Sequence, residues 1–234
     1  MLAACILTFL TAASVAFAAP SPKTRCNTSK DTLVMPSTAN SGSLPLVAPP
    51  AGGPSFIGVG VGVQNYTCAS TGTYSSTGAV AELFDVSCLP EPTFSMITTL
   101  AYDVWKDAPK GVTVQSVING LAALQPAFVL GQHYFIVNPL TGSGTSPKWD
   151  FTSASEAGNP NAFVVGAKTG DVPAPTNPTT NVDWLSLKGV QGELATAIYR
   201  MDTQGGQPPA SCTPGTPDIS VRYSSLYMLY GSSV

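Results

Sequence analysis

The sequence predicts an all-β fold, either a β-sandwich or a flattened barrel, with a short two-helix insertion. Charged residues make up only 10% of the 234-residue chain, whereas soluble proteins usually have ~25% and exposed helices depend on them. The chain also contains 22 glycines and 21 prolines, which supply frequent turns. Between those turns, short segments alternate apolar and polar side chains with the period of a β-strand. A hydrophobic content of 44% argues against disorder.

The N-terminus has the features of a secretory signal peptide, residues 1–18. Residues 5–19 are apolar or small and uncharged, and this run is shorter than the ~20 residues that cross a membrane. Ala16-Phe17-Ala18 matches the small-x-small cleavage rule; the alternative is a buried N-terminal helix. We therefore expect a secreted chain in which residues 19–55 form a Pro-rich arm and residues 56–234 a single β domain.

The first predicted strand alternates valine with glycine over residues 58–63, which places the valines on one face. The valines occupy odd-numbered positions, whereas after Gln64 the apolar residues Tyr66 and Cys68 occupy even-numbered positions and would therefore face the other side of a regular strand. This change predicts a β-bulge near Gln64 that turns Asn65 outward.

Residues 94–124 change to a helical pattern, with apolar residues three and four positions apart. The pattern predicts two short helices that are separated at residues 108–111. Thr113 is positioned to cap the second helix. We expect this pair of helices to be inserted between strands.

The remaining predicted strands are residues 128–137, 148–152, 163–168, 182–190, 193–202 and 219–230. In the second of these, alternation places Trp149 and Asp150 on opposite faces. In residues 193–202 both faces are apolar, with Ile198 on one and Tyr199 on the other. This pattern is typical of a strand that is covered on both sides.

The cysteines predict disulfide bonds rather than a metal site. No C-x-x-C motif occurs and His133 is the only histidine, so we expect no zinc and no other cofactor. Four cysteines remain after signal cleavage, an even number in a secreted chain, and four allow three pairings. The four are Cys26, Cys68, Cys88 and Cys212.

The sequence also contains two N-glycosylation sequons, which begin at Asn27 and Asn65.

The positively charged residues are scattered singly along the chain, which limits the classes of partner that the protein can bind. The ten lysines and arginines form no basic patch, so nucleic acid is not expected as a partner. No second long hydrophobic run occurs, so a membrane is not expected either. The sequence does not indicate the oligomeric state.

Candidate chemistry is spread along the chain. His133 could act as a general base or be a packed strand histidine. A pair of carboxylates could hydrolyse a glycoside. The two candidate pairs are Glu82 with Asp85 and Asp150 with Asp183. The alternative is that these acids are solvated or cap turns. Arg200 and Asp202 lie two residues apart, so they share a strand face and could pair, either around an anion or sugar hydroxyl or as a structural ion pair. Trp149 and Trp184 could stack on a sugar or pack in the core.

Several segments resemble a known family. They are Gly62–Cys68, Gly131–Phe135, Pro147–Trp149, Asp183–Leu187, Tyr199–Gly206, Pro209–Cys212 and Val221–Tyr227. In this order they resemble the secreted family called domain of unknown function 3455, found in filamentous fungi and some bacteria, over about residues 56–231. The family has no established activity. Cys68 and Cys212 lie inside these segments and Cys26 and Cys88 outside them, so the resemblance implies the pairings Cys68–Cys212 and Cys26–Cys88.

Some members of that family carry the name malate dehydrogenase, and the residues of this chain argue against that activity. A dinucleotide site needs G-x-G-x-x-G in a turn from strand to helix. Here Gly58, Gly60 and Gly62 alternate with valines and no helical pattern follows. We therefore do not expect NAD-dependent malate oxidation.

The function expected from these observations is that of a secreted non-enzymatic protein that acts at a cell surface or host interface and binds a glycan or a protein. The alternatives are a secreted carboxylate-dependent hydrolase similar to glycosidases, or a structural wall or matrix protein. The candidate ligand-site residues are His133, Trp149, Asp150, Asp183, Trp184, Arg200 and Asp202. If they act together, they should line one cleft.

Overall fold

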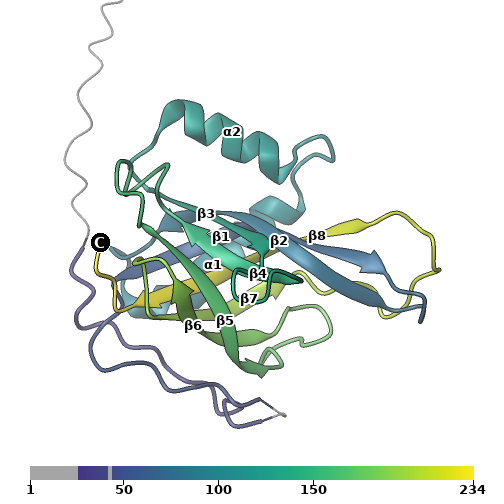
Figure 1. Ribbon diagram of the computed structural model, residues 1–234, viewed down its shortest axis with the longest axis horizontal. Helices are drawn as coiled ribbons and strands as arrows, with labels where there is room; N and C mark the ends of the chain where they lie inside the picture. The colour runs from purple at the N-terminus through teal and green to yellow at the C-terminus, as the bar shows by residue number, and fades with distance from the viewer. Residues whose placement is uncertain (1–25, 42–43) are drawn as a thin grey trace, which may run out of the picture.

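The computed structural model describes residues 26–41 and 44–234, so the predicted signal peptide lies outside the described residues. The described chain forms a closed barrel of eight antiparallel strands, in which each strand pairs with the next and the last pairs with the first (Figure 1). The all-β prediction is confirmed, and the structure selects the barrel over the sandwich. The strands are β1 (Phe56–Cys68), β2 (Tyr74–Asp85), β3 (Val129–Val137), β4 (Thr145–Asp150), β5 (Phe163–Val172), β6 (Trp184–Gln191), β7 (Ala197–Gly205) and β8 (Ile219–Tyr230).

The predicted helical insertion is present between β2 and β3. It comprises a short 3-10 turn, η1 (Glu91–Thr93), and two helices, α1 (Phe94–Lys106) and α2 (Val114–Leu124). Thr113 caps α2 as expected, because its hydroxyl accepts from the Ser116 amide at 3.1 Å. Both helices lie outside the barrel, and α2 crosses the outer side of the sheet (Figure 1).

The glycine face of β1 is the inner face of the barrel. A Cβ atom at Gly60 would lie 2.6 Å from a ring carbon of Tyr227, so the glycine makes room for that ring inside the barrel. The valines of β1 face outward, and Val59 packs in the outer hydrophobic cluster. The small residues of β1 therefore make room inside the barrel for a large ring from the neighbouring strand β8.

An irregularity does occur near Gln64, between Asn65 and Tyr66, but the prediction that it changes the face of the β1 side chains is wrong. Gln64 and Tyr66 continue the inner face of β1, and both are buried. The irregularity lies on the β2 side of this pair of strands, because Asn65 pairs with Gly78 while Tyr66 pairs with Ser76. Asn65 still faces outward, by simple alternation along β1.

Strand β2 was not predicted from the sequence. Its alternation is interrupted by the bulge next to Gly78. Moreover, Glu82 is a charged residue on its outer face that is nevertheless buried, with 3% of its surface exposed. Both features disrupt the apolar–polar pattern by which a strand is recognised.

A second hydrophobic layer covers the outside of β1, β7 and β8. It joins Tyr199 and Met201 of β7 to Phe94 of α1 and to Leu46 of the N-terminal arm. Ile198, the neighbour of Tyr199, packs in the inner core. The prediction that this strand is covered on both sides is therefore confirmed, and the arm packs on the barrel rather than lying free.

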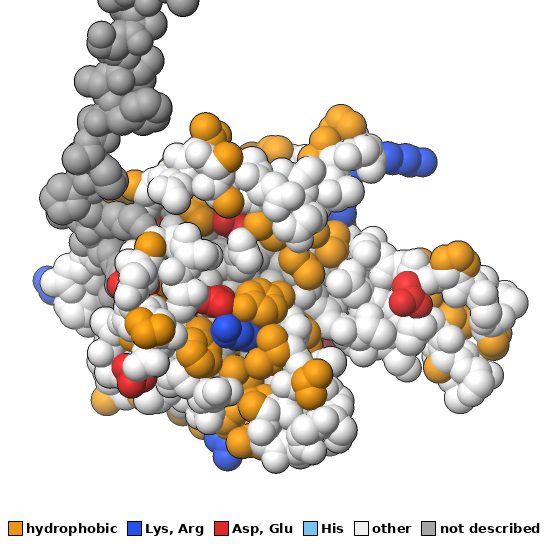
Figure 2. Space-filling model, turned by 45° about the horizontal axis from the view of Figure 1, so that its top comes forward, with side chains coloured by type: hydrophobic (Ala, Val, Ile, Leu, Met, Phe, Trp, Pro, Cys, Tyr) orange, Lys and Arg blue, Asp and Glu red, His pale blue; other side chains and the backbone are white. Residues whose placement is uncertain are grey.

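Both predicted disulfides are present. Cys26–Cys88 fastens the arm beside the end of β2, and Cys68–Cys212 ties the end of β1 to the loop before β8. Two disulfides are typical of proteins from oxidising compartments. In the described part of the chain, neither helix has the length and hydrophobicity needed to cross a membrane. Charged side chains are few on the face shown in Figure 2, where hydrophobic groups form several patches.

Candidate functional site

A pocket of about 420 Å³ lies at one end of the barrel, and we call it the mouth pocket. Mouths of β-barrels are common places for ligand sites, and the usual size range begins near 300 Å³. Its walls combine apolar and aromatic side chains with a few polar ones. The residues that bear on its chemistry are Gln64, Tyr66, Phe135, Lys168, Asp171, Asp183, Leu185 and Arg200.

Two buried polar atoms of the mouth pocket lack a hydrogen-bond partner. Gln64 is 5% exposed, and its Nε2 makes no hydrogen bond of good geometry among the described residues, although its amide lies near the Tyr223 hydroxyl and acts against the effect of burial on the pKa of that group. Asp171 Oδ1 is also buried and unpartnered within the described residues, while its Oδ2 accepts from Lys168 Nζ at 2.6 Å. A buried polar group without a partner is costly, so an unused donor and an unused acceptor in one pocket indicate a polar ligand.

Arg200 fixes the wall that carries Asp183. Its Nε and Nη2 atoms donate to the carbonyl oxygen of Asp183 at 3.0 and 2.7 Å. Thr203 holds the preceding residue in the same way, donating to the carbonyl oxygen of Val182 at 2.6 Å. These contacts attach the segment before β6 to β7.

Asp183 and Asp171 form an acid pair at the mouth. Burial raises the pKa of Asp183, and so does the negative charge of Asp171, while Arg200 acts in the opposite direction. When Asp183 is protonated it can donate a hydrogen bond to Asp171, which also raises this pKa. Asp183 therefore keeps its proton to a higher pH than an isolated carboxyl does, and while it is ionised Asp171 has no donor from this neighbour.

His133 lies deeper in the barrel, inside an aromatic cluster. Its ring stacks on Trp149 with centroids 4.5 Å apart, and Tyr227 lies 5.6 Å away. Burial lowers the pKa of His133 to about 3, so the ring is neutral near pH 7. Its Nδ1 lies 3.0 Å from the carbonyl oxygen of Lys148 and donates to it. The structure thus supports the packed-histidine interpretation rather than a general base.

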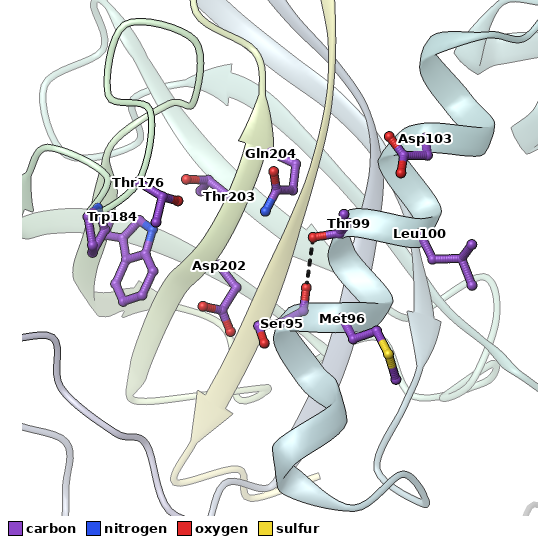
Figure 3. Close-up of a pocket in the computed structure, with 11 residues that line it drawn as sticks. Ser95, Met96, Thr99, Leu100, Asp103, Thr176, Trp184, Asp202, Thr203 and Gln204 are labelled. Carbon is purple, nitrogen blue, oxygen red and sulfur yellow. Dashed lines mark hydrogen bonds between the residues drawn. The ribbon is translucent and has the colours of Figure 1, made fainter.

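Trp184 and Asp202 lie on the outside of the barrel, in a groove beside α1 of about 540 Å³ (Figure 3). In Figure 3, they face Ser95 and Thr99 of α1 across this outer groove. The expected Arg200–Asp202 pair is wrong: the β7 register shifts between Met201 and Gln204, and Asp202 adopts a left-handed backbone with φ 46°. Arg200 therefore faces the mouth pocket and Asp202 the outer groove.

Asp150 belongs to a third location, the outer face of β4. Its carboxylate accepts from Tyr134 at 2.7 Å and pairs with Lys148 at 2.8 Å. These contacts lower the pKa of Asp150 to about 2 against the opposing effect of burial. Asp150 and Asp183 thus lie on opposite faces of the barrel wall and cannot act as a catalytic pair.

The other predicted carboxylate pair is not formed either. Glu82 lies on the outer face of β2, whereas Asp85, three positions later, lies on the other face and pairs across the sheet with Gly58. Asp85 accepts from the Ser87 amide at 2.9 Å, as a turn residue does.

The seven predicted site residues are therefore not in one cleft. Asp183 and Arg200 meet at the mouth, His133 and Trp149 lie in the core beneath it, and the other three are outside. Gln64 and Asp171 were not recognised as site residues. The signal in the sequence was a glutamine at an inward position of β1, and its meaning depended on knowing which face was inside.

Comparison with known proteins gives one match. A family model described as Protein of unknown function (DUF3455) matches residues 49–231, most of the chain. Neither the curated proteins nor the solved structures contain a match to this chain.

Proposed function

Because the chain belongs to the DUF3455 family, for which no activity is described, we propose its function from the geometry: it is a secreted carbohydrate-binding protein that holds one sugar unit of a glycan in the mouth pocket. The observation that carries this proposal is the coexistence of a donor, Gln64 Nε2, and an acceptor, Asp171 Oδ1, that make no hydrogen bond of good geometry with the described residues and belong to side chains lining one concave space.

Sugar hydroxyls match this arrangement, since each hydroxyl donates one hydrogen bond and accepts others. Gln64 would donate to a hydroxyl oxygen and Asp171 would accept from a hydroxyl group. Tyr66 and Phe135 line the same pocket and supply aromatic surface for the C–H face of the ring. Leu185 adds an apolar wall, so the pocket has the mixture of apolar surface and few polar groups that is usual in ligand sites.

Binding is favoured over hydrolysis by the acid pair itself. A retaining glycosidase needs its two carboxyl groups about 5 Å apart, and an inverting enzyme needs a larger separation. Asp171 and Asp183 are close enough for a hydrogen bond between them, which leaves no room for a scissile bond. His133 is buried and neutral, so it does not supply a general base at the mouth.

Secretion is supported by the signal-like N-terminus and by the two disulfides. A surface with few charges is also suited to contact with uncharged polysaccharides. The expected setting is therefore the cell wall or the host surface.

The test begins with a glycan array probed with the purified secreted protein, followed by calorimetry with the best ligand. Gln64→Leu should weaken binding by up to about tenfold, the cost of one neutral hydrogen bond. Asp171→Asn should weaken it by about 10- to 100-fold, since a charged acceptor is lost. Trp184→Ala, in the outer groove, is the control and should leave the affinity within about twofold.

Two results would contradict the proposal. One is the absence of binding to any array glycan and to soluble wall oligosaccharides at millimolar concentration. The other is loss of binding in Trp184→Ala while Gln64→Leu and Asp171→Asn bind normally, because that outcome would move the site to the outer groove.

A further inference from the structure

A second cavity lies beneath α2, on the outer side of the barrel wall and with no lining residue in common with the mouth pocket, and we call it the α2 cavity. Its volume is about 310 Å³, within the range of small-molecule sites. It lies between the end of α2, the outer faces of β2 and β3, and the loop after β4. Its lining includes Glu82, Leu121, Pro126, Val129, Gln132 and Ser155.

Glu82 is the feature that requires an explanation. Only 3% of its surface is exposed, and its Oε2 has no hydrogen-bond partner among the described residues. Its neighbour across the β2–β3 ladder is Gln132, which also lines the cavity. Burial raises the pKa of Glu82 to about 7, so a carboxyl group is held here at a clear energetic cost.

A second unsatisfied atom belongs to another residue that lines the same cavity. Ser155 Oγ is buried and, within the described residues, lacks a hydrogen-bond partner. Ser155 belongs to the loop after β4 and Glu82 to β2, so two separate segments each bring an unused oxygen to one cavity. The remaining wall is largely aliphatic, with Leu121, Pro126 and Val129 around these two oxygens.

Glu82 is the only ionisable side chain among the described residues that line the cavity. One strand further on, Asp150 lies opposite Gln132 in the β3–β4 ladder, but it is paired with Lys148 at 2.8 Å. No lining residue therefore supplies a positive charge to Glu82 within the described chain. Ala122, Gln125 and Ser153 are exposed as well as lining, so the cavity has a rim that is open to solvent.

We propose that the α2 cavity binds a small primary amine with an apolar body, whose ammonium group donates to Glu82 Oε2 and Ser155 Oγ. An ammonium group has three N–H donors and no acceptor, which suits two oxygens that both lack partners. Its charge compensates the buried carboxylate, and the aliphatic wall takes the apolar body. An alcohol of the same shape fills the same space but leaves the charge uncompensated.

The experiment uses 2-phenylethylamine and its isostere 2-phenylethanol as probes of the full secreted protein at pH 7.5. Amide NMR and calorimetry give the site and the affinity. The amine should bind at least about tenfold more tightly than the alcohol and shift the amides of Ala122, Ser153 and Ala157. Because Glu82 gives up its remaining proton, the binding enthalpy should change with the ionisation enthalpy of the buffer.

Glu82→Gln keeps the shape and removes the charge, so it should lose the preference for the amine while binding the alcohol as before. Ser155→Ala is a milder second variant and should weaken amine binding several-fold even if Glu82→Gln folds poorly. Asp103→Asn, on the exposed side of α1, is the charge-matched control and should change nothing. Gln64→Leu should also leave amine binding unchanged, which separates this site from the mouth pocket.

Equal affinity for the two probes would overturn the proposal, and so would unaltered amine binding in both the Glu82 and the Ser155 variants. Failure of the amine to bind at 10 mM would overturn it as well, since the cavity would then hold water only.

Discussion

Two buried ionisable groups should give this protein opposing pH dependences of stability. The folded-state pKa of His133 is about 3 because the ring is buried, whereas an unfolded histidine titrates near 6.5. As the pH falls below ~6.5, the unfolded chain takes up a proton that the folded state excludes. The free energy of unfolding should therefore fall by about 2 kcal/mol from pH 6.5 to 4.5, with a slope that approaches about 1.4 kcal/mol per pH unit well below pH 6.5.

Glu82 acts in the other direction. Burial raises its folded-state pKa to about 7, above the ~4.3 of an unfolded glutamate. The folded state thus holds a proton that the unfolded state releases as the pH rises through this window. The contribution of Glu82 is fully present below pH ~4 and falls by about 2 kcal/mol between pH 4.5 and 6.5. The two effects should nearly cancel in the native protein.

Single substitutions separate the two effects. His133→Gln should make the protein more stable on going from pH 6.5 to 4.5, and Glu82→Gln should make it less stable, each by about 2 kcal/mol relative to the native profile. The measurement is urea unfolding at pH 4.5, 5.5 and 6.5, followed by tryptophan fluorescence. Each variant is compared with the native protein at the same pH, so titrations common to both cancel. Profiles that run parallel to the native one in both variants would refute the assignment of these two buried groups.

The remaining predictions concern stability. Arg222 donates to five carbonyl oxygens at and beyond the end of α1. Arg222→Met should therefore lower the free energy of unfolding by about 2–3 kcal/mol. A change below about 0.5 kcal/mol in urea unfolding would contradict this prediction. Gly60→Ala places a Cβ 2.6 Å from the buried Tyr227 ring and should cost about 1–3 kcal/mol in thermal unfolding, while unchanged stability would show that the ring yields. Replacing Cys26 and Cys88 with serine removes a link between residues 62 apart, with a loss of up to about 4 kcal/mol by the chain-entropy relation. In limited proteolysis the arm should then be cut before the barrel, and early cleavage of the barrel itself would count against this account.

Local patterns predicted most of the elements. The apolar spacing of residues 94–124 predicted two helices, found as α1 and α2, and the residues expected as the last strand are β8, Ile219–Tyr230. Alternation also assigned faces correctly, since Trp149 lies inside and Asp150 outside. These properties depend on neighbours along the chain, which is why the sequence reveals them.

Properties set by closure of the barrel were not predictable in this way. Alternation tells which residues share a face but does not tell which face is inside. Gln64 was therefore interpreted as the position where the apolar face of the strand changes, rather than as part of the mouth pocket. The left-handed backbone at Asp202 separates it from Arg200, although they stand two residues apart. Glu82 appeared as a surface acid because its burial depends on α2, which packs over it from elsewhere in the chain.

The central claim is that the mouth pocket binds sugar, and the most direct measurement is an NMR titration of the ¹⁵N-labelled protein with the best array ligand. Two side-chain signals report on the two competing locations: the amide of Gln64 in the mouth pocket and the indole N–H of Trp184 in the outer groove. The account predicts that the Gln64 amide shifts in a saturable manner, because its free Nε2 gains a partner, while the Trp184 indole signal stays in place. A saturable shift of the Trp184 indole with an unmoved Gln64 amide would contradict it.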